Sequence, residues 1–121
     1  MTITITPTGA YLDGRKLAIS LPDAALLGKP SLLSDRCVLC GSRELLDPPH
    51  HCPQKSRVPK RAHDLIPLLT LCRPCHGLAH KRGGIMEPYH DGDWWALLDS
   101  EAAESVTARG RAVEAGAVRL R

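Results

Sequence analysis

The sequence predicts a small α+β fold, and three observations support this class. The chain has 121 residues, no Phe and only 3% aromatic residues, so one modest core must be filled by aliphatic side chains. Strand-like patterns in the first two thirds of the chain are followed by helix-like patterns. Two Cys-x-x-Cys pairs frame the middle, and a short chain with ten Gly and ten Pro gains stability from a bound metal.

Residues 1–36 are expected to form an N-terminal extension built as a β-hairpin. Thr2 to Thr6 alternates Ile with Thr, which is the period of two typical of a strand. Asp13-Gly14 predicts a turn into a second strand near residues 16–21. Residues 23–34 are rich in Leu and Ala but give no clear pattern, and we find no functional motif in this part.

Residues 37–83 are expected to form the central unit, which begins with a metal-binding turn and a strand. In the turn Cys37-Val-Leu-Cys40-Gly41, the glycine supplies the permissive backbone that such a turn needs. A first strand is predicted between Leu45 and Cys52. Pro48 and Pro49 cannot donate ladder hydrogen bonds, so they restrict this strand to an edge or make His50 its effective start.

A second strand and a helix complete the central unit. The apolar run from Asp64 to Leu71 fits a strand, although Pro67 weakens that prediction. The turn Cys72-Arg-Pro74-Cys75 then begins a helix, because Pro suits the first helical turn. Gly83-Gly84 is expected to end it.

Residues 84–121 are expected to form a C-terminal helical appendage. Asp93 is a good N-cap, and Trp95, Leu98, Ala102 and Val106 recur at helical spacing. We interpret that apolar stripe as packing against the core rather than as a binding motif.

The two cysteine pairs predict one structural Zn²⁺ bound by Cys37, Cys40, Cys72 and Cys75. The 31 residues between Cys40 and Cys72 exceed the roughly 15–20 of a simple zinc ribbon, so the insert must carry something more. Cys52 is interpreted as a small buried apolar residue. A disulfide framework is the weaker alternative, and another places His50, His51 or Cys52 in the zinc shell.

The insert carries a pair of histidines, and two more follow the last cysteine. Neighbouring side chains of a strand point to opposite faces, so His50 and His51 are expected to have different roles, one as a metal ligand and one facing a substrate water. His76 and His80 lie four residues apart on the predicted helix and therefore share a face. Zinc at Cys75 would fix His76 opposite the strand that carries His50. This arrangement predicts a second, catalytic metal site.

The positive charge of the chain is concentrated around these histidines. Between Pro53 and Arg82, seven basic residues face one acid, for a net charge of +6: Lys55, Arg57, Lys60, Arg61, Arg73, Lys81 and Arg82 against Asp64. A polyanion such as nucleic acid is the natural partner of such a surface. The plain alternative is an ordinary solvated loop.

These motifs resemble the HNH (ββα-metal) endonucleases that carry a cysteine-bound zinc. The matching order is Cys37-x-x-Cys40, then His50-His51-Cys-Pro, then Leu71-Cys72-Arg-Pro-Cys75-His76-x-x-x-His80, and it covers about residues 37–82. The stretch Lys60-Arg-Ala-His63-Asp64-Leu also resembles a phage-associated subgroup that includes the Ref-type recombination nucleases. The resemblance implies a zinc-stabilised ββα-metal core, to which the N-terminal strands and the C-terminal helix are added.

The same resemblance implies a phosphodiester hydrolase that cuts double-stranded or branched DNA and leaves 5′-phosphate and 3′-hydroxyl ends. His50 and His76 would bind Mg²⁺ or another divalent metal, and His51 would be the general base. His80 would be a third ligand or a phosphate contact. Many relatives orient the base with an Asn, near whose place Pro67 stands here. Either His63 or Asp64, the nearest polar residues, would take over this catalytic role, or the activity would be impaired.

Other classes of protein fit the sequence less well. No apolar run approaches the roughly 20 residues that span a bilayer, and the N-terminus lacks the pattern of a signal peptide. We therefore expect a cytoplasmic protein with reduced thiols. The chief alternative to the nuclease is a non-catalytic zinc module that binds nucleic acid or a protein partner.

Overall fold

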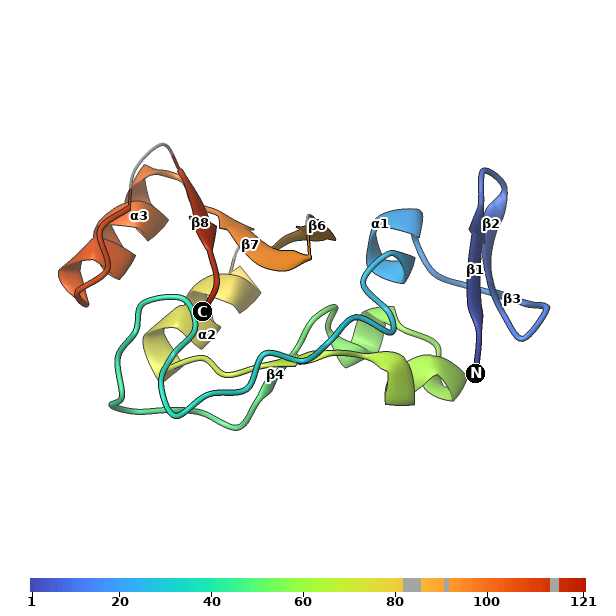
Figure 1. Ribbon diagram of the computed structural model, residues 1–121, viewed down its shortest axis with the longest axis horizontal. Helices are drawn as coiled ribbons and strands as arrows, with labels where there is room; N and C mark the ends of the chain where they lie inside the picture. Colours follow the sequence, from blue (N-terminus) through green and yellow to red (C-terminus); the bar gives the residue numbers. More distant parts are fainter. Residues whose placement is uncertain (82–85, 91, 114–115) are drawn as a thin grey trace.

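The protein has a mixed α+β architecture, drawn out along one axis (Figure 1). The computed structural model describes residues 1–81, 86–90, 92–113 and 116–121. The three-stranded sheet within residues 3–17 lies at one end, and α3 (Ser100–Ala108) with β8 (Ala117–Arg119) lies at the other. The paired strands β4 (His50–His51) and β5 (Leu68–Leu69) lie between them. Among the described residues, no helix has the length and apolar character needed to cross a bilayer.

The N-terminal end is a meander of three antiparallel strands, β1 (Ile3–Thr6), β2 (Gly9–Leu12) and β3 (Arg15–Leu17). The predicted strand at residues 2–6 and the Asp13-Gly14 turn are confirmed, and Gly14 takes a φ of 81° there. The predicted hairpin gains a middle strand, because a second turn lies between Thr6 and Gly9. A short helix α1 (Leu21–Ala24) follows, capped by the Ser20 side chain.

The centre of the molecule contains shorter strands than the sequence predicts. β4 (His50–His51) pairs antiparallel with β5 (Leu68–Leu69), and His50 lies opposite Leu69. The first strand begins at His50, as the two prolines before it predict. The strand predicted over residues 64–71 is wrong in extent, because residues 64 and 65 belong to a 3₁₀ helix and Pro67 cannot donate to the ladder. Two 3₁₀ helices, η1 (Lys55–Arg57) and η2 (Lys60–Leu65), fill the loop between β4 and β5.

Helix α2 (Arg73–Lys81) follows β5 directly and begins within the second cysteine turn, as predicted. Its backbone closes onto that turn through the His76 amide, which donates to the Cys72 carbonyl at 2.8 Å. The predicted stop at Gly83-Gly84 lies outside the described residues.

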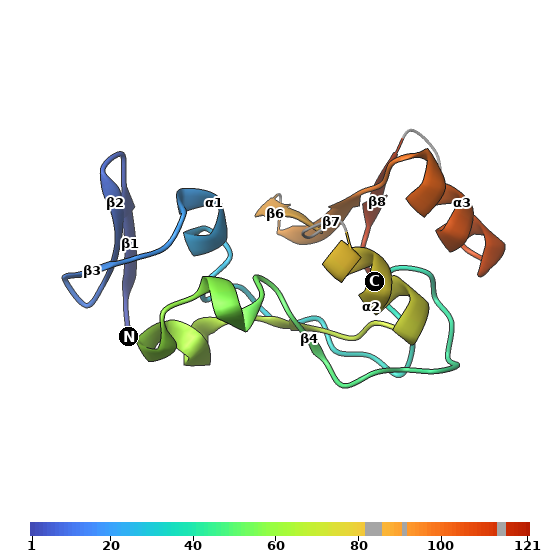
Figure 2. The same ribbon diagram turned by 180° about the vertical axis from the view of Figure 1, so that it is seen from behind.

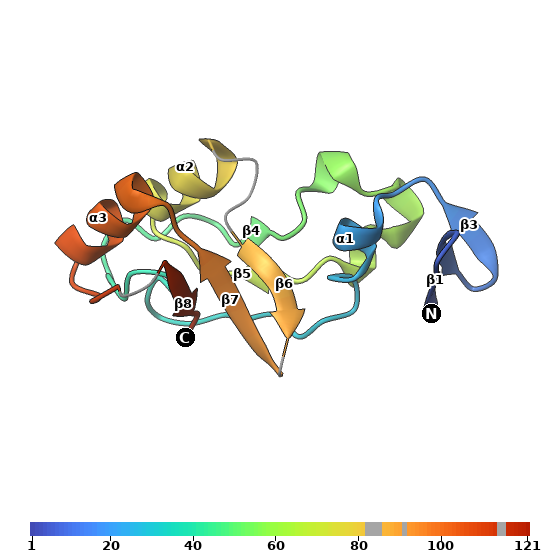
Figure 3. The same ribbon diagram turned by 90° about the horizontal axis from the view of Figure 1, so that it is seen from above.

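The C-terminal part corrects the predicted appendage. Asp93 does not cap a helix: it begins the strand β7 (Asp93–Leu97), which pairs with β6 (Met86–His90) and β8 (Ala117–Arg119). These strands lie side by side in the view from above (Figure 3). The helix α3 (Ser100–Ala108) starts later, where the Asp99 side chain accepts from the Ala102 amide at 2.8 Å.

Two hydrophobic clusters hold these parts together. The larger one, the sulfur-side core, combines the four paired cysteines with the C-terminal sheet and α3, and includes Leu39, Leu69, Leu71, Ala96, Ala102 and Val106. The smaller one, the N-terminal core, consists of Leu12, Leu17, Leu27, Val58, Ala62 and Ile66. The basic loop of η1 and η2 therefore packs on the N-terminal part, as the reverse view shows (Figure 2).

Candidate metal centres

The four paired cysteines meet in one buried group, here called the sulfur cage: Cys37, Cys40, Cys72 and Cys75. The Sγ atoms of Cys40 and Cys72 lie 3.6 Å apart. Sulfurs bound to one tetrahedral Zn²⁺ at 2.3 Å would be about 3.8 Å apart, whereas a disulfide would bring them to about 2.05 Å. The cage could therefore hold a metal ion such as zinc, as the sequence predicts.

Backbone hydrogen bonds shape both turns of the cage. In the first turn the Gly41 amide donates to the Cys37 carbonyl at 2.8 Å, and Gly41 takes a φ of 84°, which favours glycine. The Cys40 amide also points at the Cys37 Sγ, at 3.5 Å. Such N–H groups stabilise thiolate charge, so the turn is suited to a metal-bound sulfur.

The thiols resist ionising together without a cation. A hydrogen bond from Cys75 lowers the pKa of Cys37 to about 4, and the same bond raises the pKa of Cys75. Burial raises the pKa of Cys72 to about 11. A divalent cation offsets this cost because a coordinating thiol loses its proton to the metal.

Cys52 lies apart from the cage, as predicted. Its side chain is buried in the sulfur-side core, and burial raises the pKa of its thiol to about 12. None of the described cysteines or histidines outside the four joins the cage.

A second group of possible ligands consists of His50, His76 and His80, whose ring nitrogens lie within 4.8 Å of one another. The ring centroids of His50 and His76 are 5.0 Å apart, and those of His50 and His80 are 5.3 Å apart. The first ring comes from β4 and the other two from one face of α2. Residues far apart in the sequence thus converge on a site separate from the sulfur cage.

The rings of α2 take part in one chain of hydrogen bonds. Gln54 Nε2 donates to His80 Nδ1 at 3.2 Å, and the Nε2 atoms of His80 and His76 lie 3.0 Å apart. At the far end, His76 Nδ1 lies 3.1 Å from Asp47 Oδ2. A carboxylate only accepts, so Nδ1 of His76 carries the proton and its Nε2 presents a lone pair to the site.

The distances suit a shared metal ion. Two nitrogens bound to one ion at about 2.1 Å lie roughly 3.0–3.4 Å apart, depending on the coordination angle. The 3.0 Å between the Nε2 atoms of His76 and His80 falls in this range. For both atoms to bind an ion, the Gln54 amide would turn so that its oxygen accepts from His80 Nδ1. The Asp47 contact already has the carboxylate–histidine form that orients metal-binding imidazoles.

The surroundings of His50 favour its neutral form, which can act as a metal ligand. Its side chain is only 4% exposed, and burial lowers its pKa to about 4, with further lowering by the charges of His76 and His80. A neutral imidazole is the form that binds metals.

His51 lies beside this group in an open pocket of about 380 Å³, here called the histidine pocket. Its lining includes Pro48, Pro49, His50, His51, Gln54, Lys55, Ser56, His76 and His80. Burial lowers the pKa of His51, and the charges of Lys55 and His63 lower it further. His51 is thus available as a neutral proton acceptor next to the three rings.

The structure places the other two predicted catalytic residues outside this lining. His63 Nε2 lies 2.8 Å from the Val58 carbonyl and 3.2 Å from the Lys55 carbonyl, so it ties the loop together. Asp64 is exposed on η2. Asp47, by contrast, was missed by sequence reasoning. The available signal was that it is the only acid between Glu44 and Asp64.

The predicted nucleic-acid contacts divide into two groups. Lys55 lines the histidine pocket, and Lys60 is exposed. Arg57 and Arg61 have partners within the protein, since Arg57 pairs with Asp23 at 3.0 Å and Arg61 donates to the Lys16 carbonyl at 2.6 Å. Arg73 pairs with Asp47 at 3.4 Å and Lys81 with Glu101 at 3.3 Å, but these two cations are 72% and 66% exposed. Arg82 lies outside the described residues.

The comparisons with known proteins add no relative. No protein-family model, no curated protein and no solved structure matches the chain. The two candidate metal sites and their surroundings are therefore the features that bear on function.

Proposed function

We propose that the chain is a metal-dependent DNA endonuclease of the HNH (ββα-metal) type. The single observation that carries this proposal is the convergence of His50, His76 and His80 beside His51 in one pocket. The antiparallel pair β4–β5 followed by α2 has the order of a ββα-metal core, and the sulfur cage joins α2 to the turn at Cys37. The narrower resemblance to phage-associated Ref-type nucleases, and the cytoplasmic location, stay predictions.

In this proposal the protein's own residues move a proton and hold the DNA. Neutral His51 accepts the proton of a water molecule, which then attacks the phosphodiester. Lys55, on the wall of the same pocket, offsets the charge of the phosphate. Asp47 and Gln54 orient the rings of His76 and His80. A divalent ion held by the three imidazoles would supply positive charge for the phosphodiester oxygens.

The donor set bears on which metal fits. Mg²⁺ prefers oxygen ligands and near-ideal octahedral geometry, whereas imidazole nitrogen suits Zn²⁺, Ni²⁺ and related ions. The three described donors of this group are all nitrogens. We therefore favour a transition metal over Mg²⁺ at the histidine pocket.

A plasmid-nicking assay tests the proposal. Zinc-loaded protein is incubated with supercoiled DNA and Mn²⁺, Ni²⁺, Co²⁺, Zn²⁺ or Mg²⁺ in turn, and His51→Ala is compared with His63→Ala. Loss of a general base lowers the rate by about 10²–10⁴-fold, so His51→Ala should lose nicking, while His63→Ala should keep it if the protein remains folded. Undiminished nicking by His51→Ala would rule out the assigned base.

A second candidate function is a non-catalytic zinc module that binds nucleic acid. It is favoured by the hydrogen-bond chain from Gln54 through His80 and His76 to Asp47, which is satisfied without an ion. Isothermal titration of the zinc-loaded protein with Ni²⁺ separates the two functions. The nuclease requires one further metal per chain, whereas the module would bind DNA with no further metal and no cleavage.

A further inference from the structure

Five arginines line one cavity at the end of the molecule where α3 and β8 lie. They are Arg36, Arg109, Arg111, Arg119 and Arg121, and the cavity, here called the arginine cavity, measures about 770 Å³. Cys40 and Gly41 of the first cysteine turn form part of its wall. The cavity therefore lies against the sulfur cage and shares no lining residue with the histidine pocket.

The arginines come from three segments, and the structure orients several of them. Arg109 donates through Nη1 to the Ser105 carbonyl at 2.9 Å and lies 2.5 Å from the Ser105 hydroxyl. Arg111 donates to the Val38 carbonyl at 2.9 Å, inside the first cysteine turn. These hydrogen-bond partners are neutral, so they place the guanidinium groups without pairing them with a carboxylate. The cage thiolates offset part of the charge of Arg111.

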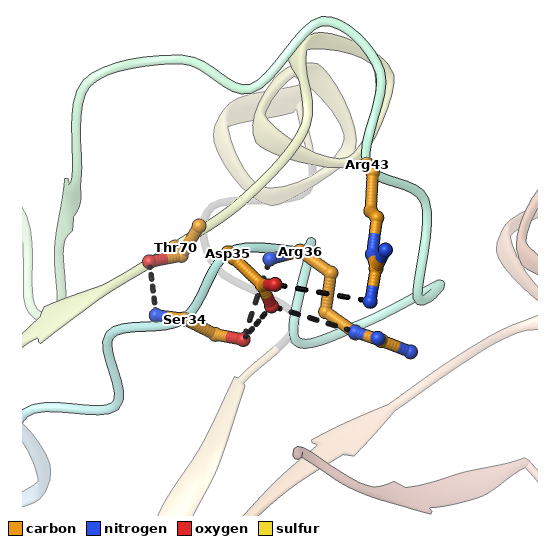
Figure 4. A network of polar contacts seen from close by, with 5 residues as sticks. All are labelled: Ser34, Asp35, Arg36, Arg43 and Thr70. Atoms are coloured by element: carbon orange, nitrogen blue, oxygen red, sulfur yellow. Dashed lines mark hydrogen bonds and ion pairs between the residues drawn. The ribbon is translucent and has the colours of Figure 1, made fainter.

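Arg36 is placed by the turn that leads into Cys37. The Ser34 amide donates to the Thr70 hydroxyl at 3.0 Å, and the Ser34 hydroxyl accepts from the Arg36 amide at 3.3 Å (Figure 4). Asp35 is shared between Arg36 at 3.7 Å and Arg43 at 3.8 Å. The single carboxylate of Asp35 is thus shared by two guanidinium groups, so the three side chains keep a net positive charge.

The cavity carries a surplus of positive charge among the described residues. Its lining contains five arginines, no Asp or Glu, and Cys40, whose thiolate would carry negative charge with a metal in the sulfur cage. Two of the arginines pair with carboxylates, Arg36 with Asp35 at 3.7 Å and Arg119 with Asp93 at 3.6 Å, and the four side chains are 45–76% exposed. Such surface pairs are weak and exchange readily with another anion.

The charge of Arg121 acts against that of Arg111. Burial lowers the pKa of Arg111, and the charge of Arg121 lowers it further, against the opposing effect of the cage thiolates. Arg keeps its proton in proteins, so the repulsion is not relieved by deprotonation. An anion between these groups would relieve it.

We propose that the arginine cavity binds consecutive phosphates of a nucleic-acid backbone. A guanidinium group matches phosphate oxygens through paired hydrogen bonds. A single phosphodiester carries one negative charge shared by two non-bridging oxygens, which two arginines satisfy, so five arginines from three segments fit a run of phosphates. The partner is the polyanion of the proposed nuclease, and in that respect this inference rests on the proposed function.

The test compares two variants of equal charge loss by fluorescence anisotropy with a labelled DNA duplex. Arg109→Gln/Arg121→Gln removes two cavity charges, and Arg15→Gln/Lys16→Gln removes two exposed charges from β3 at the far end. Both are made in the zinc-loaded full chain carrying His51→Ala, so that the duplex stays intact. Affinity is measured between about 50 and 200 mM KCl, a range over which binding to phosphates depends strongly on salt.

The cavity variant should lose affinity at least about tenfold, and its slope of log K against log salt should fall by about 1.8, since each lost phosphate contact removes about 0.9. The β3 variant should keep the wild-type slope. Equal changes in both variants, or a parent chain that does not bind the duplex, would overturn the proposal.

A competition experiment distinguishes binding of a nucleic-acid backbone from binding of a small phosphate ligand. Inorganic pyrophosphate is added at constant ionic strength. Backbone binding predicts no displacement of the duplex at about 1 mM, because a single small anion cannot replace several phosphate contacts. Displacement that is lost in the cavity variant would instead assign the cavity to a small ligand. Binding through the cavity by a chain that never nicks DNA would refute the nuclease and leave this inference in place.

Discussion

The carboxylate of Asp47 lies 3.1 Å from Nδ1 of His76, and the same carboxylate pairs with Arg73 Nε at 3.4 Å. The hydrogen bond from His76 is the largest cause that lowers the pKa of Asp47, followed by Arg73 after the opposing effect of burial. Asp47 itself is held because its amide donates to the Leu71 carbonyl at 3.0 Å, just before Cys72. The backbone that carries the sulfur cage thus also sets the orientation of a ring in the histidine pocket.

Asp47→Ala should therefore weaken metal binding at the histidine pocket while leaving zinc in the sulfur cage. Partners of this kind are worth about 10–100-fold in metal affinity. The zinc-loaded protein is titrated with Co²⁺ or Ni²⁺, and the heat of binding is measured by calorimetry. Asp64→Ala is the control, because Asp64 is exposed and does not line the pocket. An unchanged affinity for Asp47→Ala would show that His76 is oriented without it.

The two kinds of cysteine should respond differently to substitution. Cys37→Ala removes a cage sulfur and should leave the chain without tightly bound zinc and largely unfolded, because structural zinc supplies about 10–16 kcal/mol of apparent binding energy. Cys52→Ala should keep one zinc per chain and lose about 1 kcal/mol of unfolding free energy for the small cavity it creates. Zinc content and circular dichroism check both. Loss of zinc from Cys52→Ala would place Cys52 in the zinc shell.

Arg57 should matter for stability, although its sequence context suggests a phosphate contact. Its guanidinium lies 3.0 Å from the carboxylate of Asp23, which is 7% exposed. Arg57→Ala leaves that carboxylate without this partner and should cost about 1–3 kcal/mol in the free energy of unfolding, measured with urea. Lys60→Ala, on the exposed side of the same loop, should change it by less than about 0.5 kcal/mol. Equal costs would mean that the Asp23 pair contributes nothing.

Leu69 connects the core to the histidine pocket. It is fully buried and lies opposite His50 in the β4–β5 pair. Leu69→Ala should destabilise the protein by about 2–5 kcal/mol, whereas Leu33→Ala, at a position 57% exposed, should have little effect. Denaturant unfolding of both variants checks this. A small cost for Leu69→Ala would mean that the pocket strand is not supported by the core beneath it.

Local patterns in the sequence predicted the parts of the fold that depend on neighbours in the chain. The alternation over residues 2–6 and the two Cys-x-x-Cys turns were readable because strand period and ligand spacing are local properties. The prediction of a helix starting at Asp93 is wrong, because Trp95 and Leu98 match helical spacing only by coincidence. The buried residues Trp94, Ala96 and Leu98 follow the period of a strand.

The rest depended on tertiary contacts that no local pattern records. Arg57 and Arg61 read as part of a basic run, yet their partners Asp23 and the Lys16 carbonyl lie more than thirty residues away. The arginine cavity joins Arg36 to Arg109, across most of the chain. The meeting of His50 with His76 was predictable only through the resemblance and the cysteine spacing, because zinc at Cys75 brings the two segments together.

The walls of the histidine pocket belong to both hydrophobic cores. His76 and His80 stand on a helix anchored in the sulfur-side core, whereas Lys55 and Ser56 belong to a loop seated on the N-terminal core. The N-terminal strands β2 and β3, which carry no functional motif, thus support one side of the histidine pocket. A fragment cut to residues 37–83 would retain every predicted ligand of both metals, and yet it would lack Leu12, Leu17 and Leu27, against which the loop that carries Lys55 packs.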